Sequence, residues 1–137
     1  MKSIVLDTNC LLSFLKNRNE RQYHVMGSVF RRISDVELEG IITGHAVSEL
    51  VFVMENVYHA TRPQIHDILT GLLDNPGVRF LEGYYIDLVL KLWPGHIKDY
   101  GDAIIASCAE KHGFEVMTFD EAFARSLKKY GIPLFTP

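Results

Sequence analysis

Residues 4–9 read Ile-Val-Leu-Asp-Thr-Asn, a short apolar run that ends abruptly at an aspartate. Three consecutive large aliphatic residues predict a strand that is buried on both faces, as in the centre of a parallel sheet. Asp7, Thr8 and Asn9 all favour helix N-caps, and we expect a helix over residues 9–16. The stretch therefore predicts a strand, a polar turn and a helix, which is the repeating unit of an α/β fold.

The rest of the chain repeats this alternation of short apolar runs and helical patterns. Further strands are predicted over residues 40–43, 78–81 and 115–118, with a short fifth strand over 132–135. Apolar spacing and capping signals predict the remaining helices over residues 21–37, 46–58, 61–73, 85–93, 102–112 and 121–130. Alternating strands and helices indicate a three-layer α/β/α fold around a mainly parallel sheet of four to five strands.

Length and composition place the chain among compact globular proteins. The 137 residues are 47% hydrophobic and 23% charged, which suits a single domain over residues 1–137 and excludes intrinsic disorder. Cys10 and Cys108 lie in apolar runs and are too few for a disulfide framework or a zinc site. No apolar run approaches the roughly 18 residues of a membrane span. We therefore expect a cytoplasmic protein without a membrane segment.

Five acids are predicted to gather at one edge of the sheet. Asp7 ends the first strand, Glu49 lies one turn into the helix after the second, and Asp120 follows the fourth by two residues. Asp102 begins the helix that leads into the fourth strand, and Asp99 lies three residues earlier. Ligands of α/β sheets bind at the carboxyl ends of the strands.

Carboxylates that meet at this edge would repel one another unless a cation neutralised them. Mg²⁺ and Mn²⁺ prefer oxygen ligands, and a water activated by such a metal can attack phosphorus. The pattern therefore indicates metal-assisted hydrolysis of a phosphodiester. The net charge of −3 at first argues against a nucleic-acid partner. Without the four acids Asp7, Glu49, Asp102 and Asp120, however, the net charge would be −3 + 4 = +1. The negative charge is thus concentrated where a bound metal would cancel it.

Each acid also has an ordinary structural explanation. Asp7 and Asp102 could cap helices, Thr118 and Glu121 have capping-box spacing, and Glu49 could be an exposed helix residue. The coincidence of several such acids at one sheet edge favours a site.

At these residues the chain resembles the PIN domain, the fold of many metal-dependent ribonucleases. The stretch Ile4-Val5-Leu6-Asp7-Thr8-Asn9 looks like the family's first strand and first acid, and Ser48-Glu49-Leu50 like its second acid. Its third and fourth motifs are similar to Asp99-x-x-Asp102-Ala103-Ile104-Ile105-Ala106 and Thr118-Phe119-Asp120-x-x-Phe123. The resemblance spans almost the whole chain. It implies that the catalytic, metal-binding acids are Asp7, Glu49, Asp102 and Asp120.

The resemblance also assigns supporting roles around these acids. Thr8, Asn9 and Thr118 would support them through hydrogen bonds, whereas Asp99 is an extra acid and Glu121 could compete for metal.

Basic residues near the predicted site offer contacts for RNA phosphates. Lys16, Arg18 and Arg21 follow the first helix and lie close enough to meet phosphates. Lys128 and Lys129 are better explained by the dipole of the helix that they end.

Within the family, a compact domain of this size is similar to VapC-type toxins of toxin–antitoxin pairs. That similarity implies an endoribonuclease with Mg²⁺ or Mn²⁺ as cofactor, an RNA substrate, a homodimer and a cognate antitoxin. Residues 23–30 and 84–86 could form a surface for the dimer or the antitoxin.

Three other functions are weighed beside it. The first two are a PIN-family RNA-processing nuclease without an antitoxin and a non-catalytic PIN-like module that binds RNA or protein. The third is phosphoryl transfer through an aspartyl-phosphate, which fits poorly. Asn9 replaces the acid that a haloacid-dehalogenase-like phosphatase needs, and Leu81-Glu82 stands where a receiver domain ends its third strand in aspartate.

Overall fold

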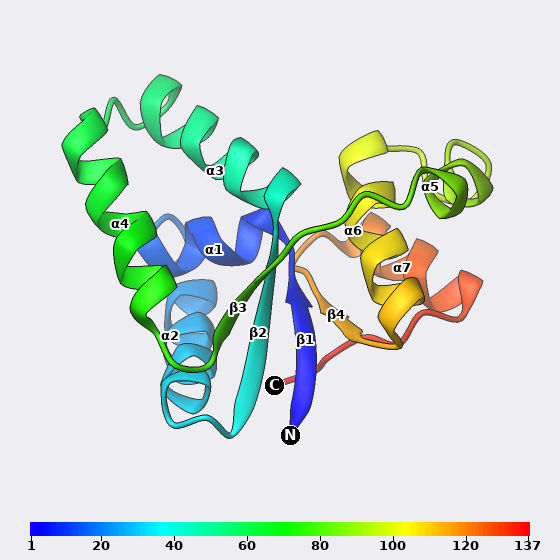
Figure 1. Ribbon diagram of the computed structural model, residues 1–137, viewed down its shortest axis with the longest axis horizontal. Helices are drawn as coiled ribbons and strands as arrows, with labels where there is room; N and C mark the ends of the chain where they lie inside the picture. Colours follow the sequence, from blue (N-terminus) through cyan, green and yellow to red (C-terminus); the bar gives the residue numbers. More distant parts are fainter.

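The protein is described over residues 1–137 by a computed structural model with four strands and seven helices (Figure 1). The strands are β1 (Lys2–Leu6), β2 (Leu38–Thr43), β3 (Val78–Leu81) and β4 (Glu115–Met117). The helices are α1 (Thr8–Leu15), α2 (Glu20–Ser34), α3 (Gly44–Asn56), α4 (Arg62–Asp74), α5 (Ile86–Leu92), α6 (Tyr100–His112) and α7 (Glu121–Tyr130).

The four strands form one sheet in the order β3-β2-β1-β4, and every neighbouring pair is parallel. From β1 the chain proceeds outward through β2 to β3 and then crosses back to place β4 on the other side of β1. The strand order therefore reverses between β1 and β4, and a ligand site in such a sheet is expected beyond the carboxyl ends of these two strands.

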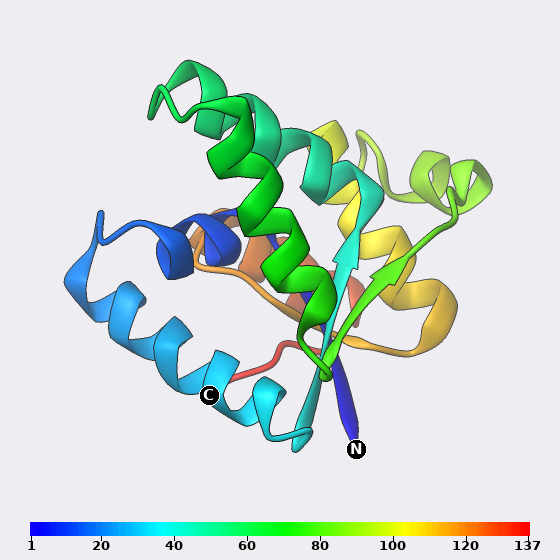
Figure 2. The same cartoon turned by 60° about the vertical axis from the view of Figure 1, so that its left-hand side comes forward.

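Two hydrophobic cores lie on opposite faces of the sheet. The alternation of side chains along β1 sends Ile4 and Leu6 into one core and Val5 into the other. The first core is covered by α1 to α4 and the second by α5 to α7. Figures 1 and 2 show these two groups of helices on either side of the strands. The predicted three-layer α/β/α class is confirmed, with a wholly parallel sheet of four strands.

The predicted fifth strand is reduced to a single bridge between Val116 and Leu134. Only two backbone hydrogen bonds join this segment to β4, from Val116 N to the Pro133 carbonyl and from Phe135 N to the Val116 carbonyl. Pro133 has no N–H group of its own, so the pairing does not extend further back along the chain.

Several helix ends follow the predicted capping chemistry. Thr61 and Gln64 form a reciprocal capping box at the start of α4, where the sequence predicts a helix from residue 61. Gly113 and Gly131 end α6 and α7 with positive φ angles of 71° and 98°, a backbone conformation that glycine adopts without steric cost.

None of the seven helices has the length and apolar character to cross a membrane. Both cysteines are free and buried.

Candidate active site

Asp7 lies at the switch point of the sheet, between the carboxyl ends of β1 and β4. It caps α1, because one carboxylate oxygen accepts a hydrogen bond from the Thr8 backbone N–H at 2.8 Å. The other oxygen accepts from Thr118 Oγ1 at 2.7 Å and from Asn9 Nδ2 at 3.1 Å. With only 6% of its surface exposed, Asp7 is a buried carboxylate held in one orientation by three donors.

Asn9 and Thr118 join the two strands around this carboxylate. Asn9 Nδ2 also donates to Thr118 Oγ1 at 3.3 Å, and Asn9 Oδ1 accepts from the Phe119 backbone N–H at 3.2 Å. The backbone N–H of Asp7 donates to the Met117 carbonyl at 3.0 Å. A polar network thus fixes the position of Asp7 relative to β4 and to the loop that follows it.

Burial raises the pKa of Asp7 from 3.8 to about 6. The hydrogen bonds from Thr118 and Thr8 oppose this rise, because they favour the ionised carboxylate. The negative charges of Glu49 and Asp120 add to the rise. Glu49 and Asp120 are therefore both close enough to act electrostatically on Asp7.

Asp102 lies in the first turn of α6, and its pKa is raised further, to about 7. Burial is the main cause, followed by the charges of Asp7, Asp99, Asp120 and Glu49. The other four acids predicted at this edge of the sheet therefore all act electrostatically on Asp102.

The N-cap of α6 is Asp99, and the alternative in which Asp102 caps the helix is wrong. Asp99 Oδ1 accepts from the Asp102 backbone N–H at 2.9 Å, so α6 begins at Tyr100, two residues earlier than predicted. The Asp102 carboxylate forms no hydrogen bond within the chain and is left free at the helix N-terminus.

Asp120 has two roles in the local structure at the start of α7. Its Oδ1 accepts from the Phe123 backbone N–H at 3.1 Å, and its own N–H donates to Thr118 Oγ1 at 3.0 Å. Asp120 is therefore the N-cap of α7, and the capping box suggested by the spacing of Thr118 and Glu121 is not formed. The carboxylate of Asp120 remains exposed at the edge of the site.

Glu49 reaches the site from α3 together with a partner that the sequence motifs did not single out. His45 lies one turn earlier on α3, and its Nε2 lies against Glu49 Oε1 without forming a well-directed hydrogen bond. A Cβ atom on Gly101 would lie 2.6 Å from His45 Nε2 and 3.3 Å from Glu49 Oε1. The absence of a side chain at Gly101 therefore lets the first turn of α6 approach the tips of these two side chains. The i,i+4 spacing of His45 and Glu49 was the only sequence signal for this pair.

The basic residues predicted to meet RNA lie beside α1 and are partly engaged within the chain. Arg18 donates to the Asn9 carbonyl at 3.0 Å and to Ser13 Oγ at 3.4 Å. Lys16 lies over the ring of Tyr58, and Arg21 lies over the ring of Phe119, 6.0 Å from its centroid. Arg21 is thus placed next to the loop that carries Thr118 and Asp120.

The donor chemistry of this edge suits a hard divalent cation. Carboxylate oxygens are the ligands that Mg²⁺ and Mn²⁺ prefer, and a cation would relieve the repulsion that helps raise the pKa values of Asp7 and Asp102. The hydroxyl of Thr8 is buried beside Asp7 without a hydrogen-bond partner. No three acidic, histidine or cysteine side chains enclose one common ion position. Mg²⁺ does not require such a cage, because it keeps several waters and takes one or two carboxylates.

The fold and the site place the protein among α/β proteins with a parallel sheet and a group of acids at its switch point. In sequence, residues 4–127 match the model of the PIN domain family. The chain belongs to the PIN domain family.

Three solved structures share the fold over almost the whole chain. VapC20 from Mycobacterium tuberculosis, described as a toxin that cleaves the sarcin–ricin loop, has a TM-score of 0.67 at 18% identity and covers 98% of this chain and 99% of its own. FitAcB from Neisseria gonorrhoeae has a TM-score of 0.61 at 19% identity, with 98% and 97% covered. VapBC2 from Rickettsia felis, solved with a DNA fragment from its promoter, has a TM-score of 0.58 at 18% identity, with 90% and 92% covered. No curated protein matches the chain in sequence.

Proposed function

We propose that this protein is a Mg²⁺- or Mn²⁺-dependent endoribonuclease and the toxin of a toxin–antitoxin pair. The observation that carries the proposal is the buried Asp7 carboxylate, fixed at the switch point and coupled by charge to the acids around it. A chain that used Asp7 only as a helix cap would gain nothing from surrounding it with further carboxylates.

The four acids Asp7, Glu49, Asp102 and Asp120 would hold the metal, some of them directly and the others through its bound waters. When bound, the cation would supply an activated water and stabilise the charge that develops on the phosphate. Thr118 and Asn9 orient the Asp7 carboxylate through hydrogen bonds of 2.7 and 3.1 Å. Membership of the PIN domain family and the fold shared with the VapC20 toxin support RNA as the substrate.

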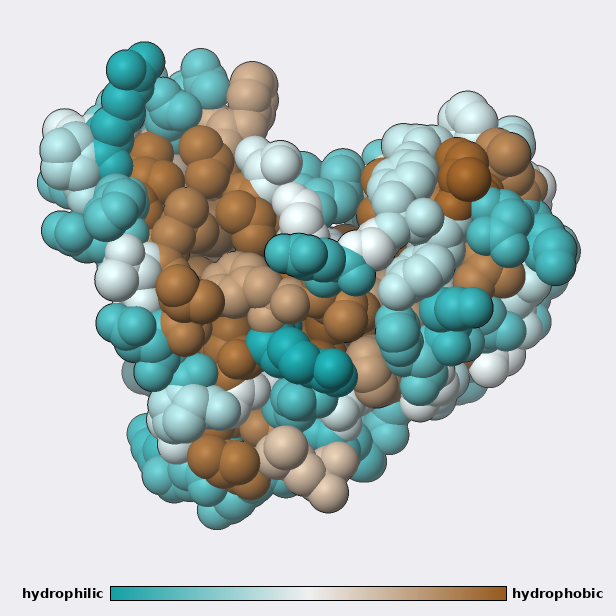
Figure 3. All heavy atoms as spheres, viewed as in Figure 1, coloured by the Kyte–Doolittle hydropathy of each residue, from teal (hydrophilic) through white to brown (hydrophobic).

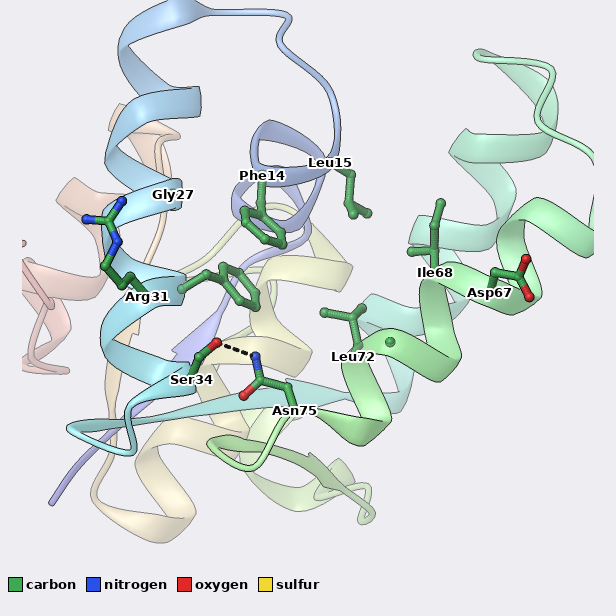
Figure 4. A pocket seen from close by; sticks show the side chains of 11 residues that line it. Phe14, Leu15, Gly27, Arg31, Ser34, Asp67, Ile68, Leu72 and Asn75 are labelled. Carbon is green, nitrogen blue, oxygen red and sulfur yellow. Dashed lines mark hydrogen bonds between the residues drawn. The ribbon is translucent and has the colours of Figure 1, made fainter.

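An apolar groove between α1, α2 and α4 supports the antitoxin part of the proposal (Figure 4). The groove has a volume of about 410 Å³, and the stacked rings of Phe14 and Phe30 form part of it. Its end is closed by a hydrogen bond of 2.9 Å from Asn75 to Ser34. A groove of this kind accepts an apolar peptide segment, and we assign it to the antitoxin.

Glycines on two walls of this groove leave room for such a segment. Gly27 in α2 and Gly71 in α4 both line it, and a Cβ atom at either position would meet nothing within 4 Å. Glycine inside a helix costs roughly 1 kcal/mol relative to alanine, and no packing within the chain compensates for that cost. The free space fits the close approach of a partner backbone.

Two further parts of the proposal concern assembly and location. Tyr84, Ile86 and Leu90 are 53%, 46% and 59% exposed at and before α5, and they support a homodimer with a contact there. Apolar side chains over this region and over α3 and α4 are visible in Figure 3. We place the protein in the cytoplasm, where its RNA substrates are found.

Metal binding can be tested without RNA. Titration of Mn²⁺ into the apo protein should raise its melting temperature in a concentration-dependent way, because a ligand that binds only the folded state stabilises it. Glu49→Gln should largely abolish this rise, whereas Glu55→Gln on the exposed part of the same helix should not. An equal rise in wild-type protein and both variants would contradict the proposed site.

The antitoxin groove can be tested by filling it. Gly71→Leu should prevent co-purification of the proposed antitoxin when the two are co-expressed, while leaving the fold intact, because leucine is a better helix former than glycine. Thr70→Leu changes the exposed neighbouring position on α4 and should retain the partner. Retention of the partner by Gly71→Leu would remove the groove from the proposal.

A further inference from the structure

A second cavity adjoins the acids on the side of the site opposite α1. It has a volume of about 620 Å³ and lies between α7 and the segment that connects α5 with α6. One wall carries Asp99 and Asp102, with Asp120 beside them. The cavity is therefore continuous with the candidate active site.

Three basic side chains line the same cavity. Arg125 and Lys129 project from α7, and Lys98 comes from the segment before α6. All three are exposed, and none forms an ion pair with a carboxylate of the chain. The Lys98 segment is held in place because the Trp93 indole N–H donates to the Lys98 carbonyl at 2.9 Å.

The arrangement of the three cations follows the path that a nucleic-acid strand would need. Arg125 and Lys129 lie one helical turn apart, roughly 6 Å along the axis of α7, so each can meet a different phosphate of one strand. Lys98 lines the same cavity from the segment between α5 and α6. With the acids at one side, a strand whose reacting phosphate lay at the acids would place its neighbouring phosphates among these cations.

We propose that this cavity is a binding subsite for the RNA phosphates on one side of the cleaved bond, with Lys98, Arg125 and Lys129 as the contacts. The inference rests on the proposed ribonuclease function and adds a substrate path to it. The subsite lies on the other side of the acids from Lys16, Arg18 and Arg21. A single RNA strand crossing the acids would thus meet basic residues on both sides of the site.

Lys128 provides a control within the same helix. It neighbours Lys129 and has the same charge, but it lines a different cavity with Gly131 and Pro133. Both lysines lie in the last turn of α7, where a positive charge interacts favourably with the helix dipole. Replacing either residue therefore has the same effect on the net charge and a similar effect on the helix.

The experiment measures binding of a short fluorescein-labelled single-stranded RNA by anisotropy in Mg²⁺ over a range of salt concentrations. Asp102→Asn serves as the parent protein, so that the RNA is not cut. Adding Lys98→Ala, Arg125→Ala and Lys129→Ala together should weaken binding on the order of tenfold at low salt. The plot of log K, the association constant, against log salt concentration has a negative slope, and its magnitude should decrease by about 2. Each of the three lost phosphate contacts on a single strand contributes about 0.7 to that magnitude.

The single charge reversals separate the subsite from bulk charge. Lys129→Glu should weaken binding several-fold more than Lys128→Glu. Equal effects of the two would overturn the proposal, because only net charge would then matter. An unchanged RNA affinity in the triple variant would also overturn it and would leave an acidic protein segment as the ligand of the cavity. Wild-type protein that neither binds nor cuts RNA in Mg²⁺ would contradict the proposed function itself.

Discussion

Replacing Asp102 by asparagine should stabilise the metal-free protein at pH 8. The carboxylate of Asp102 forms no hydrogen bond within the chain, so its removal breaks no such contact. What disappears is a negative charge that is half-buried and repelled by the acids around it, with its pKa raised from 3.8 to about 7. Asparagine has nearly the same size and no charge, so it keeps the shape and removes the repulsion.

The size and the pH dependence of this effect follow from the shifted pKa. A rise of the pKa from 3.8 to about 7 means that the ionised carboxylate destabilises the folded state by at most roughly 4 kcal/mol. Solvent reaches this half-buried carboxyl, and screening reduces the expected gain to about 1–2 kcal/mol. Wild-type stability is lost as the pH rises from 4 through 7, because the folded state binds the proton more tightly than the unfolded state. The advantage of the variant is therefore largest above pH 7 and fades toward pH 4.

Thermal unfolding in EDTA measures the effect directly. Asp102→Asn should unfold about 4–8 °C above the wild type at pH 8, with a smaller difference at pH 5. Glu110→Gln removes a charge from the exposed end of the same helix and should change the unfolding free energy by less than about 0.5 kcal/mol. Adding Mn²⁺ should stabilise the wild type and leave Asp102→Asn nearly unchanged. An Asp102→Asn protein that is less stable than the wild type at pH 8 in EDTA would refute this reasoning.

Variants at three further positions test other contacts of the site. Gly101→Ala should leave stability nearly unchanged but weaken Mn²⁺ binding measured by calorimetry, because its Cβ would displace His45 Nε2 and, through that contact, the Glu49 carboxylate. Unchanged affinity would show that Glu49 does not depend on this close approach. Thr118→Val should lower the unfolding free energy by about 2 kcal/mol and raise the pKa of Asp7 above about 6 in an NMR titration, because Asp7 loses its main stabilising hydrogen bond. A pKa that stays or falls would contradict that role. Asp99→Ala should cost about 1 kcal/mol in urea unfolding and Asp99→Asn much less, since asparagine also caps helices; equal losses would show that capping is not its main role.

The fold could be predicted from the sequence because its signals are local. Ile4-Val5-Leu6 followed by Asp7 defines a buried strand and the cap after it, and Gly113 and Gly131 mark helix ends. The fifth strand was overpredicted because its length depends on pairing with β4, which residues 132–135 alone do not specify.

The acids could be placed at one edge from strand periodicity, but their individual contacts could not. Whether Asp99 or Asp102 caps α6 depends on where the helix begins, and both residue types suit a cap. The contact of Gly101 with His45 and Glu49 joins two helices that are distant in sequence, so it requires the tertiary structure. The same holds for the cavity shared by Lys98 and Arg125.

Cleavage of RNA by the purified protein tests the proposed ribonuclease site most directly. Total RNA is incubated with wild-type protein and with Asp7→Asn, in Mg²⁺, in Mn²⁺ and in EDTA, and the products are separated on a denaturing gel. We predict discrete cleavage products from the wild type with either metal, none in EDTA, and none from Asp7→Asn. Cleavage by Asp7→Asn at the wild-type rate, or wild-type cleavage that persists in EDTA, would contradict the account.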